Sequence, residues 1–301
     1  MRTGVVLMTY GAPASDADLP RYLGAVRGGR VPDEALVEEM RRRYARIGGS
    51  PLVRITKAQA AALERDLGAD WAVAAGMRFS APSIDEAVAT LAARGASFVV
   101  GICMSPQWSP LLMGGYAREL AAATSRAGVA SVIADAWYRA PAFLESLAAA
   151  VREELARGEA FVLLTAHSLP RRVFDAEPEY IAQLKKTGAL VAAAAGLADD
   201  RWRWAYQSAG HTQEEWLRPD LTELFPDIRA RGATDVLVAP VQFLADHLEV
   251  LYDLDVAAAE QARAAGLRYR RIAMPNTRPA FIRALADVAR RTAASALSAV
   301  R

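Results

Sequence analysis

The chain has 301 residues, enough for one large domain or two of ordinary size, and 53% of them are hydrophobic while 23% are charged. That balance is typical of a folded globular protein and excludes a disordered chain. The formal net charge is only +2, and no basic stripe interleaved with aromatic residues is present, so we expect no binding of nucleic acid.

Cysteine content and hydropathy exclude further classes of protein. Cys103 is the only cysteine, which excludes an internal disulfide and the four thiolates of an iron–sulfur cluster, and its apolar surroundings predict a buried side chain. The longest apolar stretches, such as residues 189–198, are shorter than the ~18 residues that a bilayer span needs. The apolar residues 4–10 lack the pattern of a signal peptide, so we expect a cytoplasmic protein without a membrane span.

Short apolar runs, each followed by Gly, Ser or Pro, recur along the chain. In order they span residues 5–9, 71–75, 98–103, 131–134, 161–166, 202–206, 236–243 and 269–274. Most are apolar throughout, which is typical of strands buried on both faces of a parallel sheet. Segments with helical spacing lie between them, for example residues 141–157 and 278–297. This alternation predicts βαβ units.

The two halves of the chain also resemble each other. Two segments, residues 93–97 and 141–144, return in the second half at nearly the same offset, and a weaker match pairs residues 7–13 with residues 164–170. Such repeats in the same structural context indicate duplication. We therefore predict an α/β fold of two similar doubly wound, Rossmann-like domains of the chelatase type, whose parallel sheets face a central cleft.

We place the domain boundary at the middle of this repeat. An N-terminal half spans residues 1–150, and a C-terminal half spans residues 151–278. We expect the remaining helix, about residues 279–301, to pack back on the first half.

The three histidines, His167, His211 and His247, all fall at or just beyond the end of a predicted strand. Ligands of open α/β sheets bind beyond the carboxyl ends of the strands. A single histidine there is usually structural, but three at one edge of a sheet favour a functional site. No glycine-rich phosphate-binding motif follows a strand, and Ser168 does not lie in a nucleophile elbow, so nucleotide binding and serine hydrolysis are unsupported.

Asp246, Glu249 and Asp253 are spaced i, i+3 and i+7, which predicts three carboxylates on one face of a helix. A solvated helix face is the ordinary interpretation, but the neighbouring residues 236–243 and 250–252 are largely apolar. Carboxylates that lead to an imidazole can pass a divalent cation inward or conduct protons outward. These ligands suit ferrous iron without selecting it over zinc or manganese.

The weak repeat match places Tyr10 where the second half has His167, so we expect a phenol and an imidazole to project into the cleft from opposite sides. Tyrosine is an axial ligand of ferric haem iron, although a core tyrosine is the simpler alternative. On the same side, Arg27 and Arg43 can bind carboxylates in bidentate fashion. The turn at residues 48–50 can offer backbone N–H groups to an anion.

Five segments of the chain resemble the ferrochelatase family, and the resemblance runs along nearly its whole length. They are residues 7–13, 43–52, 165–170, 206–208 and 243–253. The most specific are His-Ser-Leu-Pro at residues 167–170 and Asp-His-Leu-Glu-Val-Leu-Tyr-Asp at residues 246–253.

The resemblance implies functional roles for matching residues. By it, His167 and Glu249 are the catalytic pair that handles the metal at the porphyrin centre. The residues implied to line the porphyrin site are Tyr10, Arg27, Arg43, Tyr44, Ser50 and Tyr116. Tyr10 is similar to the tyrosine that ligates the product iron in coproporphyrin enzymes of this family.

Two positions depart from the family's pattern. Phe79 stands where some relatives have a histidine, and Ala257 stands where some have a further acidic residue. Both departures argue against an outer metal site.

We therefore predict an enzyme that inserts ferrous iron into coproporphyrin III to give coproheme, with iron as a substrate and no tightly bound cofactor. A protoporphyrin IX ferrochelatase and a cobalt or nickel chelatase acting on another tetrapyrrole stay open. A non-catalytic haem-binding protein would need Tyr10 but not the pair of His167 and Glu249. A periplasmic-type binding protein would call for a signal peptide. We expect a monomer that passes its product transiently to a coproheme decarboxylase.

Overall fold

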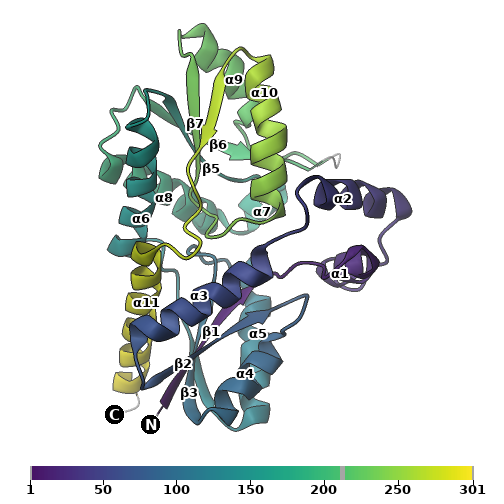
Figure 1. Ribbon diagram of the computed structural model, residues 1–301, viewed down its shortest axis with the longest axis vertical. Helices are drawn as coiled ribbons and strands as arrows, with labels where there is room; N and C mark the ends of the chain where they lie inside the picture. Colours follow the sequence, from purple (N-terminus) through teal and green to yellow (C-terminus); the bar gives the residue numbers. More distant parts are fainter. Residues whose placement is uncertain (1, 211–213, 300–301) are drawn as a thin grey trace.

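The computed structural model describes residues 2–210 and 214–299, and within them eight strands form two four-stranded parallel sheets (Figure 1). The first sheet has the order β2-β1-β3-β4, with β1 at Arg2–Thr9, β2 at Trp71–Met77, β3 at Ala96–Cys103 and β4 at Ala130–Ile133. The second has the order β6-β5-β7-β8, with β5 at Phe161–His167, β6 at Trp202–Gln207, β7 at Asp235–Pro240 and β8 at Arg268–Arg271. The predicted α/β fold is confirmed, and the two sheets share one strand order.

Burial on both faces explains why the central strands are apolar throughout. Val5, Val6 and Leu7 of β1 are fully buried, as are residues 162–164 of β5, because helices cover both faces of each sheet. The predicted end of β7 at residue 243 is wrong. The strand ends at Pro240 and the chain turns at residues 241–242, while Val241 and Phe243 stay buried as part of the core. Apolar composition alone therefore made the strand too long.

Helices connect the strands in both halves. They are α1 (Leu19–Val26), α2 (Glu34–Arg46), α3 (Leu52–Leu67), α4 (Ile84–Ala93), α5 (Pro110–Ala127), α6 (Pro141–Leu155), α7 (Arg171–Ala176), α8 (Pro178–Ala195), α9 (Leu221–Ala230), the π-helix η2 (Glu249–Ala258), α10 (Ala259–Ala264) and α11 (Pro279–Ala299), with a 3₁₀ turn η1 at Asp16–Asp18. α4 and α9 follow equivalent strands, and both begin with a capping box, formed by Ser83 with Glu86 and by Asp220 with Glu223.

The last helix of each half packs on the other half. α6 follows β4 but packs on α8, whereas α11 follows β8 but packs on α3 and against β3 and β4 (Figure 1). The two helices also pack on each other. The C-terminal helix thus lies beside the first sheet. The division of the chain at residue 150 stays a prediction, since α6 joins both parts.

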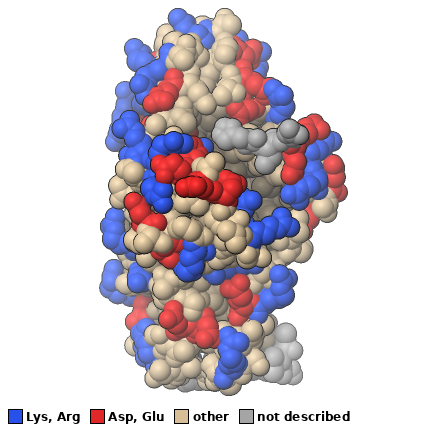
Figure 2. Space-filling model, turned by 90° about the vertical axis from the view of Figure 1, so that its right-hand side faces the viewer, with Lys and Arg blue, Asp and Glu red and all other residues tan. Residues whose placement is uncertain are grey.

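The face that carries α1 and α2 shows basic and acidic side chains interspersed, without a continuous field of one sign (Figure 2). Cys103 is buried at the end of β3, as its apolar run predicts. Across residues 2–210 and 214–299, no helix combines the length and the hydropathy that crossing a bilayer requires.

Candidate active site

A cavity of about 420 Å³ lies between the two sheets. Its walls come from segments that follow β1, β3, β5 and β7, with contributions from α1, α2, α3 and α5. This is the edge at which open α/β sheets bind ligands. Six predicted site residues line the cavity, namely Tyr10, Tyr44, Ser50, Tyr116, His167 and Glu249.

His167 is the last residue of β5, and one contact holds its backbone while another orients its ring. Its backbone N–H donates to Gln242 Oε1 at 2.9 Å, and its Nδ1 lies 2.5 Å from the carbonyl oxygen of Ser168. A carbonyl only accepts hydrogen bonds, so we assign the proton of the neutral ring to Nδ1. The lone pair of Nε2 is then available toward Glu249, whose Oε1 lies 3.9 Å away.

Glu249 is the first residue of the π-helix, and its carboxylate lies between the imidazoles of His167 and His247. Its Oε2 lies 3.5 Å from Nε2 of His247, and Nδ1 of His247 lies 2.9 Å from the carbonyl oxygen of Ala245. Burial raises the pKa of Glu249, but it is outweighed by the positive charge that His167 and His247 carry when protonated and by the hydrogen bond from His247, which together lower this pKa to about 2. Burial lowers the pKa of His247, yet Glu249 outweighs it and raises that pKa above 6.5. An ionised carboxylate therefore stands between the two rings at neutral pH.

The predicted row of three carboxylates on one helix face is wrong. Asp246 precedes the helix, where Arg271 and Asn276 contact it. Asp253 lies within the π-helix, 3.7 Å from NH1 of Arg43, and burial raises its pKa. Because a π-helix bonds residue i to i+5, α-helical spacing does not describe which side chains align.

Aromatic side chains form the wall that follows β1. The Tyr10 side chain keeps 45% of its surface exposed, so the alternative of a core tyrosine is wrong. Its ring centroid lies 4.9 Å from that of Phe79 and 6.5 Å from that of Tyr116. Arg78 Cζ lies over both of these neighbours, at 4.8 Å and 5.5 Å from the ring centroids. The wall offers flat apolar surface and a phenol.

The predicted arginines lie outside this lining. Arg27 is exposed at the end of α1, and Arg43 donates to Glu39 at 2.8 Å and lies over the ring of Tyr252. In the predicted anion-binding turn, the N–H groups of residues 48 and 49 donate to the carbonyls of Ala45 and Tyr44, so the turn itself uses these two.

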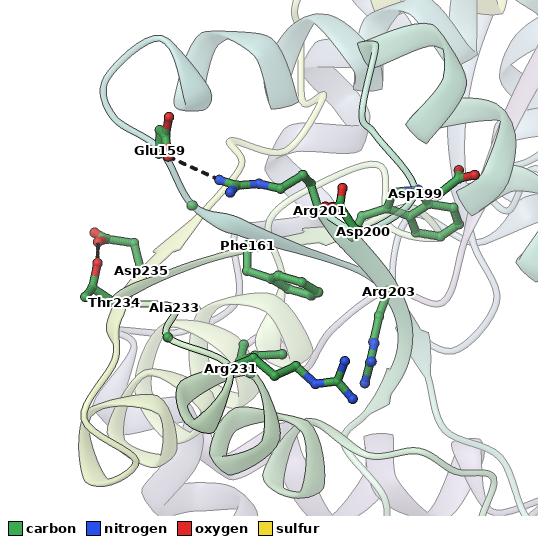
Figure 3. A pocket seen from close by; sticks show the side chains of 14 residues that line it. Glu159, Phe161, Asp199, Asp200, Arg201, Arg203, Arg231, Ala233, Thr234 and Asp235 are labelled. Carbon is green, nitrogen blue, oxygen red and sulfur yellow. Dashed lines mark hydrogen bonds and ion pairs between the residues drawn. The ribbon is translucent and has the colours of Figure 1, made fainter.

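A second hollow of about 420 Å³ lies at the amino ends of β5, β6 and β7 (Figure 3). Its basic side chains are paired, since Arg201 contacts Glu159 at 3.3 Å while Arg203 and Arg231 both contact Asp227. This hollow lies at the sheet edge opposite to the one where such folds bind ligands. The cavity between the sheets is therefore the candidate active site.

Within the described parts of the chain, no group of three His, Cys, Asp or Glu side chains is arranged to hold a metal ion. His211 lies outside the described residues.

The comparison with known families decides which chemistry the cavity serves. A family model described as ferrochelatase matches residues 2–293. The chain belongs to the ferrochelatase family. It is therefore a ferrochelatase-type enzyme, which inserts iron into a porphyrin, and the predicted family and enzyme class are confirmed.

Sequence relatives of this ferrochelatase cover almost its entire length. It is 37% identical over 303 residues to the ferrochelatase of Deinococcus radiodurans, which spans 97% of this chain and 96% of the relative. It is 38% identical over 299 residues to the coproporphyrin III ferrochelatase of Geobacillus kaustophilus, covering 95% and 94% of the two chains.

Solved structures with the same fold are more distant in sequence. CbiX, described as the terminal enzyme of siroheme biosynthesis in denitrifying bacteria, has a TM-score of 0.58 at 14% identity, over 97% of this chain and 99% of its own. SirB from Bacillus subtilis with Fe3+ has a TM-score of 0.59 at 12% identity, over 99% and 98%. At these identities the comparison shows a shared chelatase fold.

Sequence reasoning missed three parts of the site. His247 was noticed only as a histidine near a strand end, and its pairing with Glu249 has no signal beyond their proximity in the sequence. Gln242 and Tyr180 carry no signal, yet Gln242 Nε2 donates to Tyr180 Oη at 2.8 Å while its Oε1 holds His167. Neutral residues of this kind become visible only in the fold.

Proposed function

We propose that this enzyme inserts Fe2+ into coproporphyrin III to give coproheme. The observation that carries the proposal is that Nε2 of His167 and Oε1 of Glu249 lie 3.9 Å apart in a cavity whose other wall presents Tyr10. A flat macrocycle between these walls has an imidazole–carboxylate pair on one side and a phenol on the other. The name of the Geobacillus kaustophilus relative supports coproporphyrin III as the substrate.

Metal insertion replaces two pyrrole protons by one divalent cation, so the reaction needs a proton acceptor at the centre of the ring. In the proposed mechanism, Nε2 of His167 has an available lone pair because Nδ1 bonds the carbonyl of Ser168, and it accepts the two pyrrole protons one after the other and releases each to solvent. The ionised Glu249 stabilises the resulting imidazolium, and His247 fixes the other carboxylate oxygen. Because His167, Glu249 and His247 adjoin one another, proton acceptance and transient iron ligation are proposed for the three groups together.

On the opposite face, the phenol of Tyr10 ligates the iron of the product. Phe79 and Tyr116 limit the directions in which its ring can turn. Tyr44 and Ser50 line the same cavity and are proposed to bind substrate propionates, with Arg27 and Arg43, outside this lining, as further propionate partners. Iron enters as a substrate, and the proposal includes no tightly bound cofactor.

The decisive experiment is anaerobic incubation with ferrous iron and either coproporphyrin III or protoporphyrin IX, followed by visible spectroscopy. We expect kcat/KM for coproporphyrin III to be at least about tenfold higher, which corresponds to about 1.4 kcal/mol of transition-state discrimination. A preference for protoporphyrin IX would contradict the proposed substrate. Cobalt with sirohydrochlorin tests the alternative of a chelatase for another tetrapyrrole.

The pair itself is tested with His167→Ala and Glu249→Gln. Both variants should lose iron insertion while the dissociation constant for coproporphyrin III, measured by tryptophan fluorescence quenching, stays near that of the wild type. A non-catalytic haem-binding protein would show no insertion in the wild type either. Normal turnover of bound substrate in His167→Ala would remove this residue from the mechanism.

We further propose a cytoplasmic monomer that passes coproheme to a decarboxylase by transient contact. Size-exclusion chromatography with light scattering measures the oligomeric state. Transfer of coproheme to an added decarboxylase, faster than its release into buffer, measures the handover.

A further inference from the structure

Arg271, in the short strand β8, reaches the segment that carries Glu249. Its side chain is only 12% exposed. Its Nε donates to Asp255 Oδ1 at 2.7 Å and its NH2 to Asp255 Oδ2 at 2.9 Å, while the same NH2 lies 3.5 Å from Asp246 Oδ1. Since these two aspartates flank Glu249 in the sequence, one guanidinium spans the segment from both sides.

The segment needs such external support. It is a π-helix, whose i to i+5 bonds are rare and occur mostly in single turns. Its N-cap, Leu248, supplies no side-chain hydrogen bond to the first turn. The direction of Glu249 therefore depends on contacts made by side chains from other elements.

A second set of hydrogen bonds holds Asp246. Asp246 Oδ2 accepts from Nδ2 of Asn276 at 2.7 Å, and the N–H of Asp246 donates to Oδ1 of Asn276 at 2.9 Å. Gln59 of α3, in the first half, donates to the carbonyls of Asn276 and Leu244 at 2.9 Å and 3.2 Å. The residue that precedes His247 is thus held from three directions, by Arg271, by Asn276 and through Gln59.

We propose that Arg271 is a positioning residue that fixes Glu249 at its distances from His167 and His247. Arg271 is not among the residues that line the cavity, so it acts through Asp246 and Asp255. The inference rests on the proposed role of Glu249. A displacement of about 1 Å at a reacting group lowers turnover by up to about 100-fold, which gives the scale of the effect.

The variant that tests this is Arg271→Lys, because lysine keeps the positive charge but cannot bond both oxygens of Asp255 while it reaches Asp246. We expect kcat for iron insertion to fall about tenfold, with the KM and the dissociation constant for porphyrin unchanged. Asp255→Asn keeps the shape of its partner and should lower kcat in the same direction. If Arg271→Lys does not fold, the kcat of Asp255→Asn tests the positioning role instead.

The matched control is Arg268→Lys, in the same strand. Arg268 also makes a bidentate ion pair, with Asp235 at 2.8 Å and 2.6 Å, but its side chain is 79% exposed and lies away from the π-helix. This variant should keep wild-type kcat. A purely structural role of Arg271 predicts a lower melting temperature with normal kcat.

Two results would overturn the inference. One is a kcat of the folded Arg271→Lys or Asp255→Asn variant within about twofold of the wild type, and the other is an equal loss of kcat in Arg268→Lys. Glu249→Gln, measured in parallel, separates a failure of the proposed function from a failure of the positioning role of Arg271. If Glu249→Gln is active, the proposed function fails; if it is inactive while Arg271→Lys is fully active, only the positioning role fails.

Discussion

Replacing Glu249 by glutamine tests the electrostatics of the site independently of catalysis. The substitution keeps the size of the side chain and removes the charge that faces His247 at 3.5 Å. We expect the pKa of His247 to fall, because its elevation above 6.5 depends on this carboxylate.

The strength of the interaction between Glu249 and His247 follows from their distance and from the exposure of Glu249. Two unit charges about 4 Å apart interact by about 1 kcal/mol in water and about 4 kcal/mol at the effective dielectric constant near a protein surface. The side chain of Glu249 keeps 41% of its surface exposed, so solvent screening places the interaction in the lower part of that range. Losing an interaction of about 1 to 2 kcal/mol with Glu249 lowers the pKa of His247.

The same pair contributes stability in a defined pH window. A histidine with a raised pKa stabilises the fold fully below its unfolded value of 6.5, and this contribution is lost as the pH rises through the folded pKa. A carboxylate with a lowered pKa stabilises the fold above its unfolded value of 4.5, and this is lost as the pH falls toward about 2. The difference in melting temperature between wild type and Glu249→Gln should therefore be largest between pH 4.5 and 6.5.

The chain has three histidines, so a titration followed by histidine 1H–15N NMR is readily assigned. Glu260→Gln serves as the control, since Glu260 is exposed in the first turn of α10. If the pKa of His247 is the same in Glu249→Gln and in the control, the ion pair is wrong and so is the reasoning about the carboxylate.

Three further outcomes are expected. A Cβ at Gly115 would lie 2.1 Å from Cζ of Arg78, so Gly115→Ala should displace this flexible side chain from the rings of Phe79 and Tyr116 and raise the KM for porphyrin severalfold, whereas Gly114→Ala, which meets Arg118 NH1 at 3.3 Å, should leave the KM unchanged. Tyr10→Met should alter the Soret band of the ferric product, and an unchanged band would remove Tyr10 as an iron ligand. Burial raises the pKa of the Cys103 thiol to about 12, so mass spectrometry should find it unalkylated in the folded enzyme at pH 8 and alkylated after unfolding.

Much of the fold follows from the sequence because burial leaves a clear pattern. Central strands such as β1 and β5 are covered on both faces, and their continuous apolar runs predict them within two or three residues. His167 and Tyr10 could be chosen because strand ends are the ligand-binding edge of such sheets. Glu249 was identified through the resemblance of its segment to a family, since periodicity alone placed it on one helix face with Asp246, which precedes the helix.

The remaining features depend on which way side chains turn in the folded chain. Arg268 and Arg271 are indistinguishable in the sequence, yet the first is largely exposed and the second is nearly covered. The π-helix likewise has no signal in residue spacing, because its geometry is stabilised by distant partners such as Arg271. Arg43 was expected to receive a propionate, and whether its contacts with Glu39 and Asp253 open for substrate is a property of the complex.

The exchange of helices between the halves has a consequence for biosynthesis. α11 supplies buried side chains, including Phe281 and Leu285, to the layer over the first sheet, and it is translated after both sheets. The apolar surface beneath it stays open to water while the second half is translated. A nascent or truncated chain that stops before Pro279 would expose this surface, which favours association with chaperones or other chains. Completion of the N-terminal half therefore waits until α11 has been translated.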